Sequence, residues 1–249
     1  MSAWIGIGRS EIGLVRTMNQ DAFAIIDHLG IWAVADGMGG HAGGEIAAQV
    51  AIATIQDQAA SASDLLRNGQ VPPTDVLTDL IGRAHEAILD RARSKSKLKG
   101  MGTTIVLLAI VPSQTPVAYL AHVGDSRAYR FRSGTLTPLT KDHSVIEKYL
   151  ERGILTPQSA KTHPERHVLT RALGVSAAAN PTIAAFPILE EDLVLLCSDG
   201  LTKMLEDEDI QHVLADGRID PVPICNRLVT AALDRGGEDN VTVAVVAHR

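Results

Sequence analysis

The chain has 249 residues, and 45% of them are hydrophobic, which supports a substantial core and argues against global disorder. Its 23 Lys and Arg residues against 29 Asp and Glu residues give a net charge of −6 at pH 7, which disfavours nucleic acid and anionic membranes as partners. Aromatic residues make up only 3%, too few for platforms that stack single-stranded nucleic acid. No apolar run approaches the ~20 residues that span a bilayer, and no signal segment opens the chain. We therefore expect a cytoplasmic monomer.

Hydrophobic periodicity predicts early strands, two long helices, more strands, a polar insert, and then strands, helices and a closing strand. In chain order, the predicted strands cover residues 3–9, 22–27, 30–36, 103–111, 116–123, 126–132, 135–139, 182–187, 192–197 and 241–248. The predicted helices cover residues 44–61, 75–97, 144–152, 207–215 and 221–235.

Several successive strands are joined by links of hairpin length, such as residues 28–29, so much of the sheet structure should be antiparallel. The helices are segregated from the strands, which favours a layered α+β fold over a doubly wound sheet. Because no linker divides the chain, we predict one domain over residues 1–249. Cys197 and Cys225 lie in apolar patterns and are expected to be buried, inert thiols, too few for a disulfide framework.

The stretch VADGMGGHAGGE (34–45) places Asp36 between an apolar strand and a glycine-rich turn that opens a helix. The spacing Gly37-x-Gly39-x-x-Ala42 meets a loose dinucleotide-binding pattern, but no strand with a terminal acid follows at the usual distance. A Walker loop is excluded, because the stretch has no Gly-Lys-Ser/Thr. A carboxylate at this position would repel a pyrophosphate, so a metal ion is the better candidate to neutralise it.

Four more aspartates sit where apolar strands give way to turns: Asp21, Asp125, Asp199 and Asp239. Carboxylates gathered in one site cannot all stay ionised without cations. An oxygen-only ligand set selects Mg²⁺ or Mn²⁺ over Zn²⁺ or Cu²⁺. For any single aspartate, a turn residue that bonds its own backbone is the ordinary alternative. Five such positions together favour a metal site.

Seven stretches then occur in a fixed order along the chain: GLVRTMNQDA (13–22), VADGMGGHAGGE (34–45), GTT (102–104), HVGDSRAY (122–129), LTKDHS (139–144), LCSDGL (196–201) and GGEDNVTVAVV (236–246). Together they resemble the metal-dependent serine/threonine protein phosphatases of the PP2C (PPM) family, bacterial branch. The resemblance implies an αββα sandwich, with two antiparallel sheets packed face to face and helices outside each. It also implies hydrolysis of phosphoserine and phosphothreonine in proteins, opposing a Ser/Thr kinase.

The resemblance further implies a site for two Mn²⁺ or Mg²⁺ ions. Matched by motif, Asp36 would bridge the two ions, and the carbonyl of Gly37 would help hold one of them. Asp199 and Asp239 would complete the other ion's ligands, and Asp21 would act mainly through coordinated waters.

The resemblance to bacterial members also implies a third ion, bound by Asp125 and by Asp199, which it would share with the two-ion site. Gln20 departs from those members that carry an acid before the equivalent of Asp21. A neutral amide there can bond a metal water but adds no charge, so it would weaken a metal site only slightly.

Arg16 matches the arginine that binds the substrate phosphate in the family. The planar guanidinium suits this role because it can donate two parallel hydrogen bonds to a phosphate. Taken alone, it would be read as a surface arginine paired with an acid. His41 could protonate the leaving oxygen as a general acid, or it could merely bond backbone in the glycine-rich turn. His122, inside a predicted strand, is read as a structural histidine.

The polar insert 144–174 corresponds to the flap that borders the site in bacterial members. It carries His163, Arg166, His167 and Arg171, and we assign His167 and Arg171 to reading the peptide around the phosphoresidue. Charge on a solvated loop is the ordinary alternative.

Two functions from different classes remain. One is a Mn²⁺- or Mg²⁺-dependent protein phosphatase. The other is a catalytically weak or inactive phosphatase-like module that binds phosphorylated partners. Such a module should have lost metal aspartates, so the presence of all five favours the enzyme.

Overall fold

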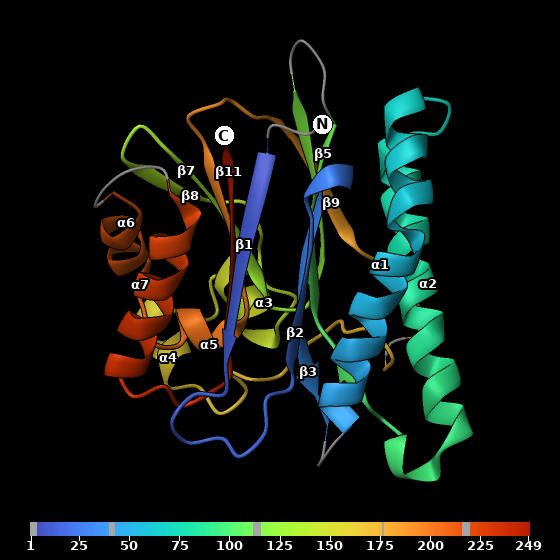
Figure 1. Cartoon of the computed structure of the whole chain (residues 1–249). Helices are drawn as coiled ribbons and strands as arrows, with labels where there is room; N and C mark the ends of the chain where they lie inside the picture. The colour runs from blue at the N-terminus through green and yellow to red at the C-terminus, as the bar shows by residue number, and fades with distance from the viewer. Residues whose placement is uncertain (1–3, 40–42, 112–115, 176, 216–219) are drawn as a thin grey trace.

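The computed structural model describes residues 4–39, 43–111, 116–175, 177–215 and 220–249. Two antiparallel sheets pack face to face, and helices cover the outer face of each, as Figure 1 shows. The αββα sandwich implied by the resemblance is therefore confirmed.

The first sheet has the strand order β1-β11-β10-β7-β8, and all neighbours run antiparallel. Its strands are β1 (Trp4–Glu11), β11 (Val241–His248), β10 (Leu193–Cys197), β7 (Arg127–Arg132) and β8 (Thr135–Pro138). The second sheet has the order β2-β3-β5-β6-β9, with β4 paired to β3. Its strands are β2 (Asp21–Ile26), β3 (Ile31–Met38), β4 (Gly102–Thr103), β5 (Ile105–Val111), β6 (Val117–Val123) and β9 (Thr182–Pro187).

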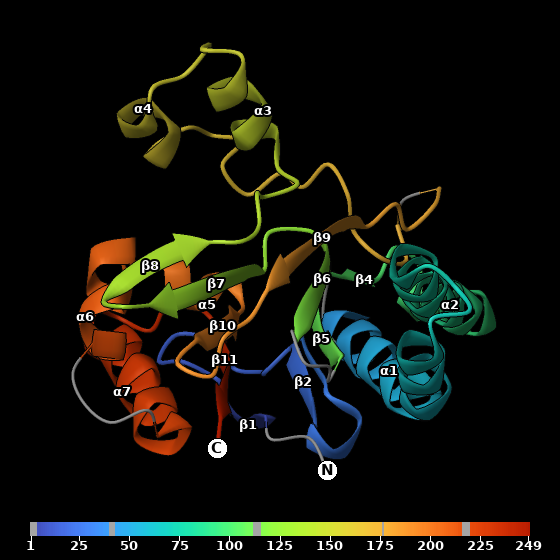
Figure 2. The same cartoon turned by 90° about the horizontal axis from the view of Figure 1, so that it is seen from above.

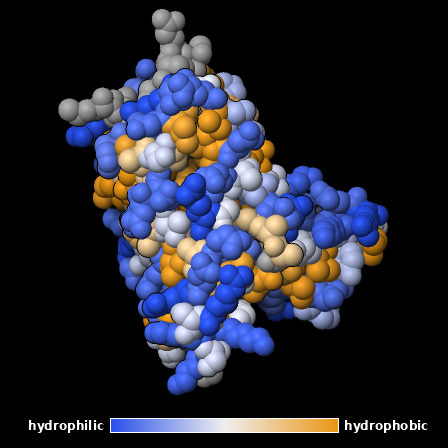
Figure 3. All heavy atoms as spheres, turned by 90° about the vertical axis from the view of Figure 1, so that its right-hand side faces the viewer, coloured by the Kyte–Doolittle hydropathy of each residue, from blue (hydrophilic) through white to orange (hydrophobic). Residues whose placement is uncertain are grey.

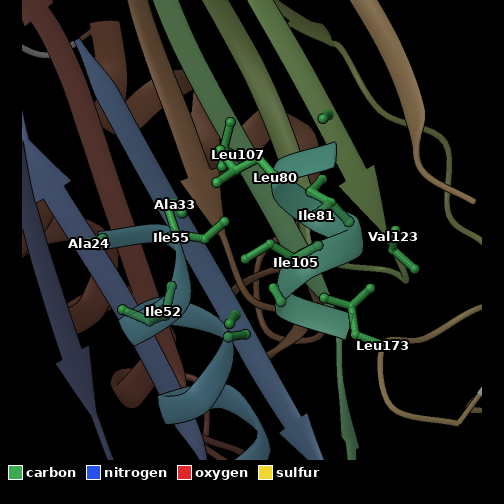
Figure 4. Close-up of a cluster of buried hydrophobic side chains, with 14 of the residues drawn as sticks. Ala24, Ala33, Ile52, Ile55, Leu80, Ile81, Ile105, Leu107, Val123 and Leu173 are labelled. Atoms are coloured by element: carbon green, nitrogen blue, oxygen red, sulfur yellow. The ribbon is translucent and has the colours of Figure 1, made fainter. Parts of the chain in front are cut away.

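Two long helices cover the second sheet, α1 (Gly43–Asn68) and α2 (Pro73–Ser94), and Figure 4 shows Ile55 and Ile81 lying over Ala33 and Ile105. The first sheet packs against α6 (Asp207–Ala215) and α7 (Pro221–Asp234). The outward face over α1 and α2 carries polar side chains interspersed with smaller apolar areas (Figure 3). Among the described residues, no helix combines the length and apolar character needed to cross a membrane.

A third apolar cluster fills the space between the sheets and contains Trp32 and Val106 from one sheet and Val194 and Val246 from the other. Strands such as β11 are covered on both faces, by this cluster and by helices. Their sequences are therefore continuous apolar runs instead of alternating patterns, and β11 is buried at every residue except the last.

The strand predictions agree with the structure to within a few residues, whereas several helix ends do not. The first helix was expected to end at residue 61 but continues to Asn68, because Leu66 is buried and the Ser63 hydroxyl donates to the carbonyl of Leu29 (2.9 Å). The second was expected to continue to 97 but ends at Ser94, where Lys95 turns extended and the 3₁₀ helix η2 (Ser96–Leu98) follows.

Other short elements were not predicted. The link at residues 28–29 lies in the 3₁₀ helix η1 (Asp27–Leu29), and α5 (Asp199–Thr202) follows β10 directly. The insert contains α3 (Val145–Glu151), near the predicted helix, and also α4 (Pro157–Lys161), which begins with a capping box between Thr156 and Ser159. Figure 2 shows α3 and α4 projecting away from the sandwich.

Both cysteines are buried, as predicted. Burial raises the pKa of each thiol, Cys197 and Cys225, to about 12, so neither is an activated nucleophile.

Candidate active site

The chain topology brings the five predicted aspartates to one end of the sandwich, the lower end in Figure 1. Asp21 opens β2 and pairs directly across the sheet with Asp36 near the end of β3. Asp125 lies in the turn between β6 and β7, Asp199 follows the end of β10, and Asp239 precedes the start of β11. Antiparallel neighbours begin and end alternately at the same edge, which is why residues so far apart in sequence meet here.

Two threonines of the GTT stretch hold the backbone of Asp36. The Asp36 N–H donates to Thr104 Oγ1 (3.1 Å), and the Thr103 hydroxyl donates to the Asp36 carbonyl (2.8 Å). The Thr104 hydroxyl also shares a hydrogen bond of 2.6 Å with the hydroxyl of Ser126, beside Asp125. This chain of bonds couples the strand of Asp36 to the turn of Asp125.

The glycines of the 34–45 stretch allow two backbone segments to touch. A Cβ on Gly37 would lie 2.1 Å from the Gly44 carbonyl oxygen, and a Cβ on Gly44 would lie 2.7 Å from Gln20 Nε2. The Gly37 N–H donates to the Gln20 carbonyl (3.0 Å). The start of α1, the end of β3 and the segment before Asp21 are therefore packed without room for side chains.

The acids at this end are half-buried and repel one another. The pKa of Asp21 is raised to about 7, by burial and by the charges of Asp199 and Asp239. Burial and the charges of Asp21, Asp199 and Asp125 raise the pKa of Asp36 well above the ordinary carboxyl value. The pKa of Asp125 is raised to about 8, by burial and by Asp199. Each of these acids therefore has an unfavourable environment for its charge.

Two carboxylate oxygens in the cluster have no hydrogen-bond partner among the residues that the structure describes. Asp21 Oδ2 accepts from the Ser198 hydroxyl (2.8 Å), but no described residue bonds the buried Asp21 Oδ1 or the buried Asp199 Oδ1. Orphaned carboxylate oxygens beside other acids fit a hard cation, which would satisfy the oxygens and relieve the repulsion.

Two basic side chains contact the rim of the acid cluster. Lys203 Nζ lies 2.6 Å from Asp199 Oδ2 and 2.9 Å from Asp239 Oδ2. Arg16 grips Asp239 with two donors, Nε at 2.9 Å from Oδ1 and Nη2 at 2.9 Å from Oδ2. Burial alone would raise the pKa of Asp239, but its bonds with Lys203 and Arg16 lower it.

With these side-chain positions, no three His, Cys, Asp or Glu side chains of the described residues converge closely enough to hold a metal ion. The five acids share one region, but Asp199 and Asp239 are paired with basic side chains, both with Lys203 and Asp239 also with Arg16.

Asn240 is a residue of the site that the sequence did not reveal, although it belongs to the GGEDN stretch. Its Nδ2 donates to the carbonyls of Ile12 and Met18 (both 2.9 Å), and its Oδ1 accepts from the Gln20 N–H (2.8 Å). Its side chain therefore ties down the loop that carries Arg16. The only sequence signal was its place beside Asp239.

We expect Asn240→Ala to lower kcat/KM about tenfold or more, because three backbone groups lose their partner and the Arg16 loop loosens. The free energy of unfolding should fall by about 1–3 kcal/mol, the cost of leaving buried polar groups unpaired. Steady-state kinetics and urea unfolding would measure both. Asn226→Ala is the matched control, since Asn226 accepts only an exposed bond from Arg9. Normal kinetics in Asn240→Ala would show that the loop does not depend on this clamp.

His143 is a second residue that the sequence analysis missed, and it fixes the Asp125 turn. Its ring nitrogen Nδ1 accepts from the Gly124 N–H (3.2 Å). The backbone N–H of His143 donates to the Gly124 carbonyl (2.9 Å). Burial and the stacked ring of His122, 4.4 Å away, lower the pKa of His143 to about 3, so the ring is neutral. His122 Nε2 bonds the Lys141 carbonyl (2.9 Å), as expected for a structural histidine.

The remaining predicted residues are placed differently. His41 lies outside the described residues. His167 is exposed on the flap. Partial burial and the charges of Lys203 and Arg166 lower its pKa, while the charges of Asp199 and Asp239 oppose this shift. Arg171 donates to Thr182 Oγ1 (3.2 Å) and to the Asn180 carbonyl (3.3 Å), so it anchors the flap on β9. The substrate roles of His167 and Arg171 stay predictions.

The family model described as protein phosphatase 2C matches residues 8–219. The chain belongs to the protein phosphatase 2C family. It is 35% identical over 241 residues to the serine/threonine phosphatase stp of Listeria welshimeri. The aligned residues cover 96% of this chain and 93% of the Listeria protein. The members of this family depend on metal, and the chain is a protein serine/threonine phosphatase.

Solved structures of relatives agree with this assignment. The crystal structure of the Mycobacterium tuberculosis serine/threonine phosphatase PstP/Ppp superposes with a TM-score of 0.85 at 34% identity, covering 98% of both chains. A structure of the PstP catalytic domain in complex with two manganese ions superposes with a TM-score of 0.80 at 33% identity, covering 98% of this chain and 97% of that one.

Proposed function

We propose that this phosphatase hydrolyses phosphoserine and phosphothreonine with a water activated by two Mn²⁺ or Mg²⁺ ions, and that it opposes a Ser/Thr kinase or acts on that kinase's substrates. The observation that carries the proposal is the crowded group of half-buried acids at one end of the sandwich, where one oxygen each of Asp21 and Asp199 has no partner among the described residues. Acids crowded together at this energetic cost, in a family that depends on metal, are best explained by a catalytic role.

In the proposed site, one ion would be held by Asp36 and the carbonyl of Gly37. The other ion would be held by Asp36, Asp199 and Asp239. Asp21 would bind waters coordinated to the ions. A third ion would use Asp125 with Asp199. When bound, the ions would supply Lewis acidity and a nucleophilic water at neutral pH. The chain's own contribution is to fix the backbone of Asp36 through Thr103 and Thr104 and the carboxylate of Asp21 through Ser198. Asn240 holds the backbone just before Asp21.

Arg16 would bind the substrate phosphate while it remains held by Asp239. A guanidinium has five N–H donors, and two of them are on Asp239. The other donors bond no described residue and can meet phosphate oxygens, and the side chain is 52% exposed. Arg16 can therefore pair with an acid and bind the substrate phosphate at the same time.

Three assignments around the substrate are retained as part of this proposal. His41 would be the general acid that protonates the leaving Ser or Thr oxygen. His167 would meet the substrate peptide at the border of the acid cluster. Arg171 would act on the substrate through its hold on the flap. The domain extent of 1–249, the monomeric state and the cytoplasmic location also remain predictions.

A direct assay separates this proposal from a phosphate-binding module without activity. We expect the purified protein to hydrolyse p-nitrophenyl phosphate and a phosphothreonine peptide with Mn²⁺ or Mg²⁺, and to lose at least ~99% of that rate after EDTA treatment. Adding Mn²⁺ back should restore the rate. Turnover that persists without metal, or no turnover with either ion, would contradict the proposal.

A further inference from the structure

Lys203 occupies a position in the acid cluster that the proposed reaction does not require. It lies one helical turn after Asp199, and its ammonium nitrogen is within 2.6 Å of Asp199 and 2.9 Å of Asp239. A lysine ammonium is positively charged at neutral pH. The proposed function assigns these same two acids to a metal ion.

We propose that Lys203 is a tethered cation that competes with the divalent metal for Asp199 and Asp239, and thereby sets the metal concentration that the enzyme needs. This inference rests on the proposed function for the identity of the metal ligands. It adds a residue that tunes metal binding without being a ligand.

The bonding of Asp239 is the first support. Lys203 donates to its Oδ2, and Arg16 donates to both Oδ1 and Oδ2, so neither oxygen is free. An ion that binds Asp239 must therefore displace a donor or share its oxygen with one. Sharing is costly, because an ammonium and a divalent cation on neighbouring oxygens repel each other.

The difference between the two basic residues is the second support. An ammonium on a flexible stem is a compact point charge that can substitute for an ion, whereas a guanidinium binds as a planar fork. Lys203 bridges two separate acids and is 30% exposed, while Arg16 holds one acid and is 52% exposed. Lys203 is therefore the better neutraliser of the cluster when the metal concentration is low.

The test compares Lys203→Met with the wild type by calorimetric titration of the metal-free proteins with Mn²⁺. We expect about tenfold tighter Mn²⁺ binding in the variant. Its melting temperature should fall without metal, because Asp199 and Asp239 lose their counter-charge, but should return to near the wild-type value with saturating Mn²⁺. Lys203→Arg keeps the charge but replaces the compact ammonium with a planar guanidinium, so its Mn²⁺ affinity should lie between those of the wild type and Lys203→Met. Lys161→Met is the matched control, since Lys161 forms an exposed ion pair with Glu206 and no other ion pair with the described residues.

Several outcomes would overturn the inference. Unchanged or weaker Mn²⁺ binding in Lys203→Met would do so, and so would an equal loss of melting temperature with and without metal, which a purely structural lysine predicts. If the metal-free variant does not fold, folding on addition of Mn²⁺ supports competition, and failure to fold even with Mn²⁺ contradicts it. A wild type that binds no Mn²⁺ would instead refute the proposed function, so the two failures are distinguishable.

Discussion

Asp36→Asn is expected to lower kcat by at least ~10³-fold at saturating Mn²⁺. The change keeps the shape of the side chain and its backbone bonds to Thr103 and Thr104, but it removes the charge proposed to lie between two ions. A metal pair stabilises the transition state by several kcal/mol, and each 1.4 kcal/mol corresponds to a factor of ten in rate. Single-turnover kinetics with a phosphothreonine peptide would measure the loss without interference from product release.

The same variant should be more stable than the wild type when no metal is present. Burial and neighbouring acids raise the pKa of Asp36 in the folded chain, so its ionisation opposes folding at every pH above the ordinary carboxyl pKa of 3.8. Asparagine has no such cost. We therefore expect a higher melting temperature at pH 8 in EDTA, with the gain shrinking as the pH falls toward 4. Near-normal kcat, or a lower metal-free stability at pH 8, would show that Asp36 is not a metal-bridging acid in a crowded cluster.

Arg16→Ala should lower kcat/KM about 10²-fold, mainly through KM. Charge-assisted hydrogen bonds contribute about 1.5–3 kcal/mol each, and Arg16 would give the phosphate at least one of them. Arg16→Lys should recover only part of the loss, because a lysine lacks the planar fork. Steady-state kinetics at saturating Mn²⁺ would keep any change in metal affinity out of the comparison.

A matched control for Arg16 is Arg83→Ala on α2, where the arginine pairs only with the exposed Asp79 one turn away. That variant should keep normal kinetics, because surface pairs of this kind contribute little. If Arg16→Ala retained the wild-type kcat/KM, Arg16 would serve only as the partner of Asp239.

Much of the fold could be predicted from the sequence. Strands covered on both faces, such as β11, are continuous apolar runs, and this signal is strong. The helix ends were harder because tertiary contacts decide them. The helix predicted to end at residue 61 continues as α1, because the Ser63 hydroxyl bonds the Leu29 carbonyl and Leu66 is buried. The pairing of the two sheets came from the family resemblance, since periodicity cannot specify which sheets face each other.

The acids of the site could also be predicted, because Asp beside Gly at the end of an apolar strand is visible in sequence. Their supporting residues could not. Asn240 and His143 act through bonds to backbone groups far along the chain, and such bonds leave no local pattern. Lys203 stands four residues after Asp199, a spacing typical of many surface ion pairs, and only the fold brings Asp239 to its other side.

A crystal structure grown with Mn²⁺, with anomalous data collected at the manganese edge, tests the central claim most directly. The account predicts at least two manganese peaks in the acid cluster, with oxygens of Asp36, Asp199 and Asp239 about 2.0–2.4 Å from them. Lys203 Nζ should have moved away from both of its acids. Manganese bound elsewhere, with Lys203 still between Asp199 and Asp239, would contradict the account.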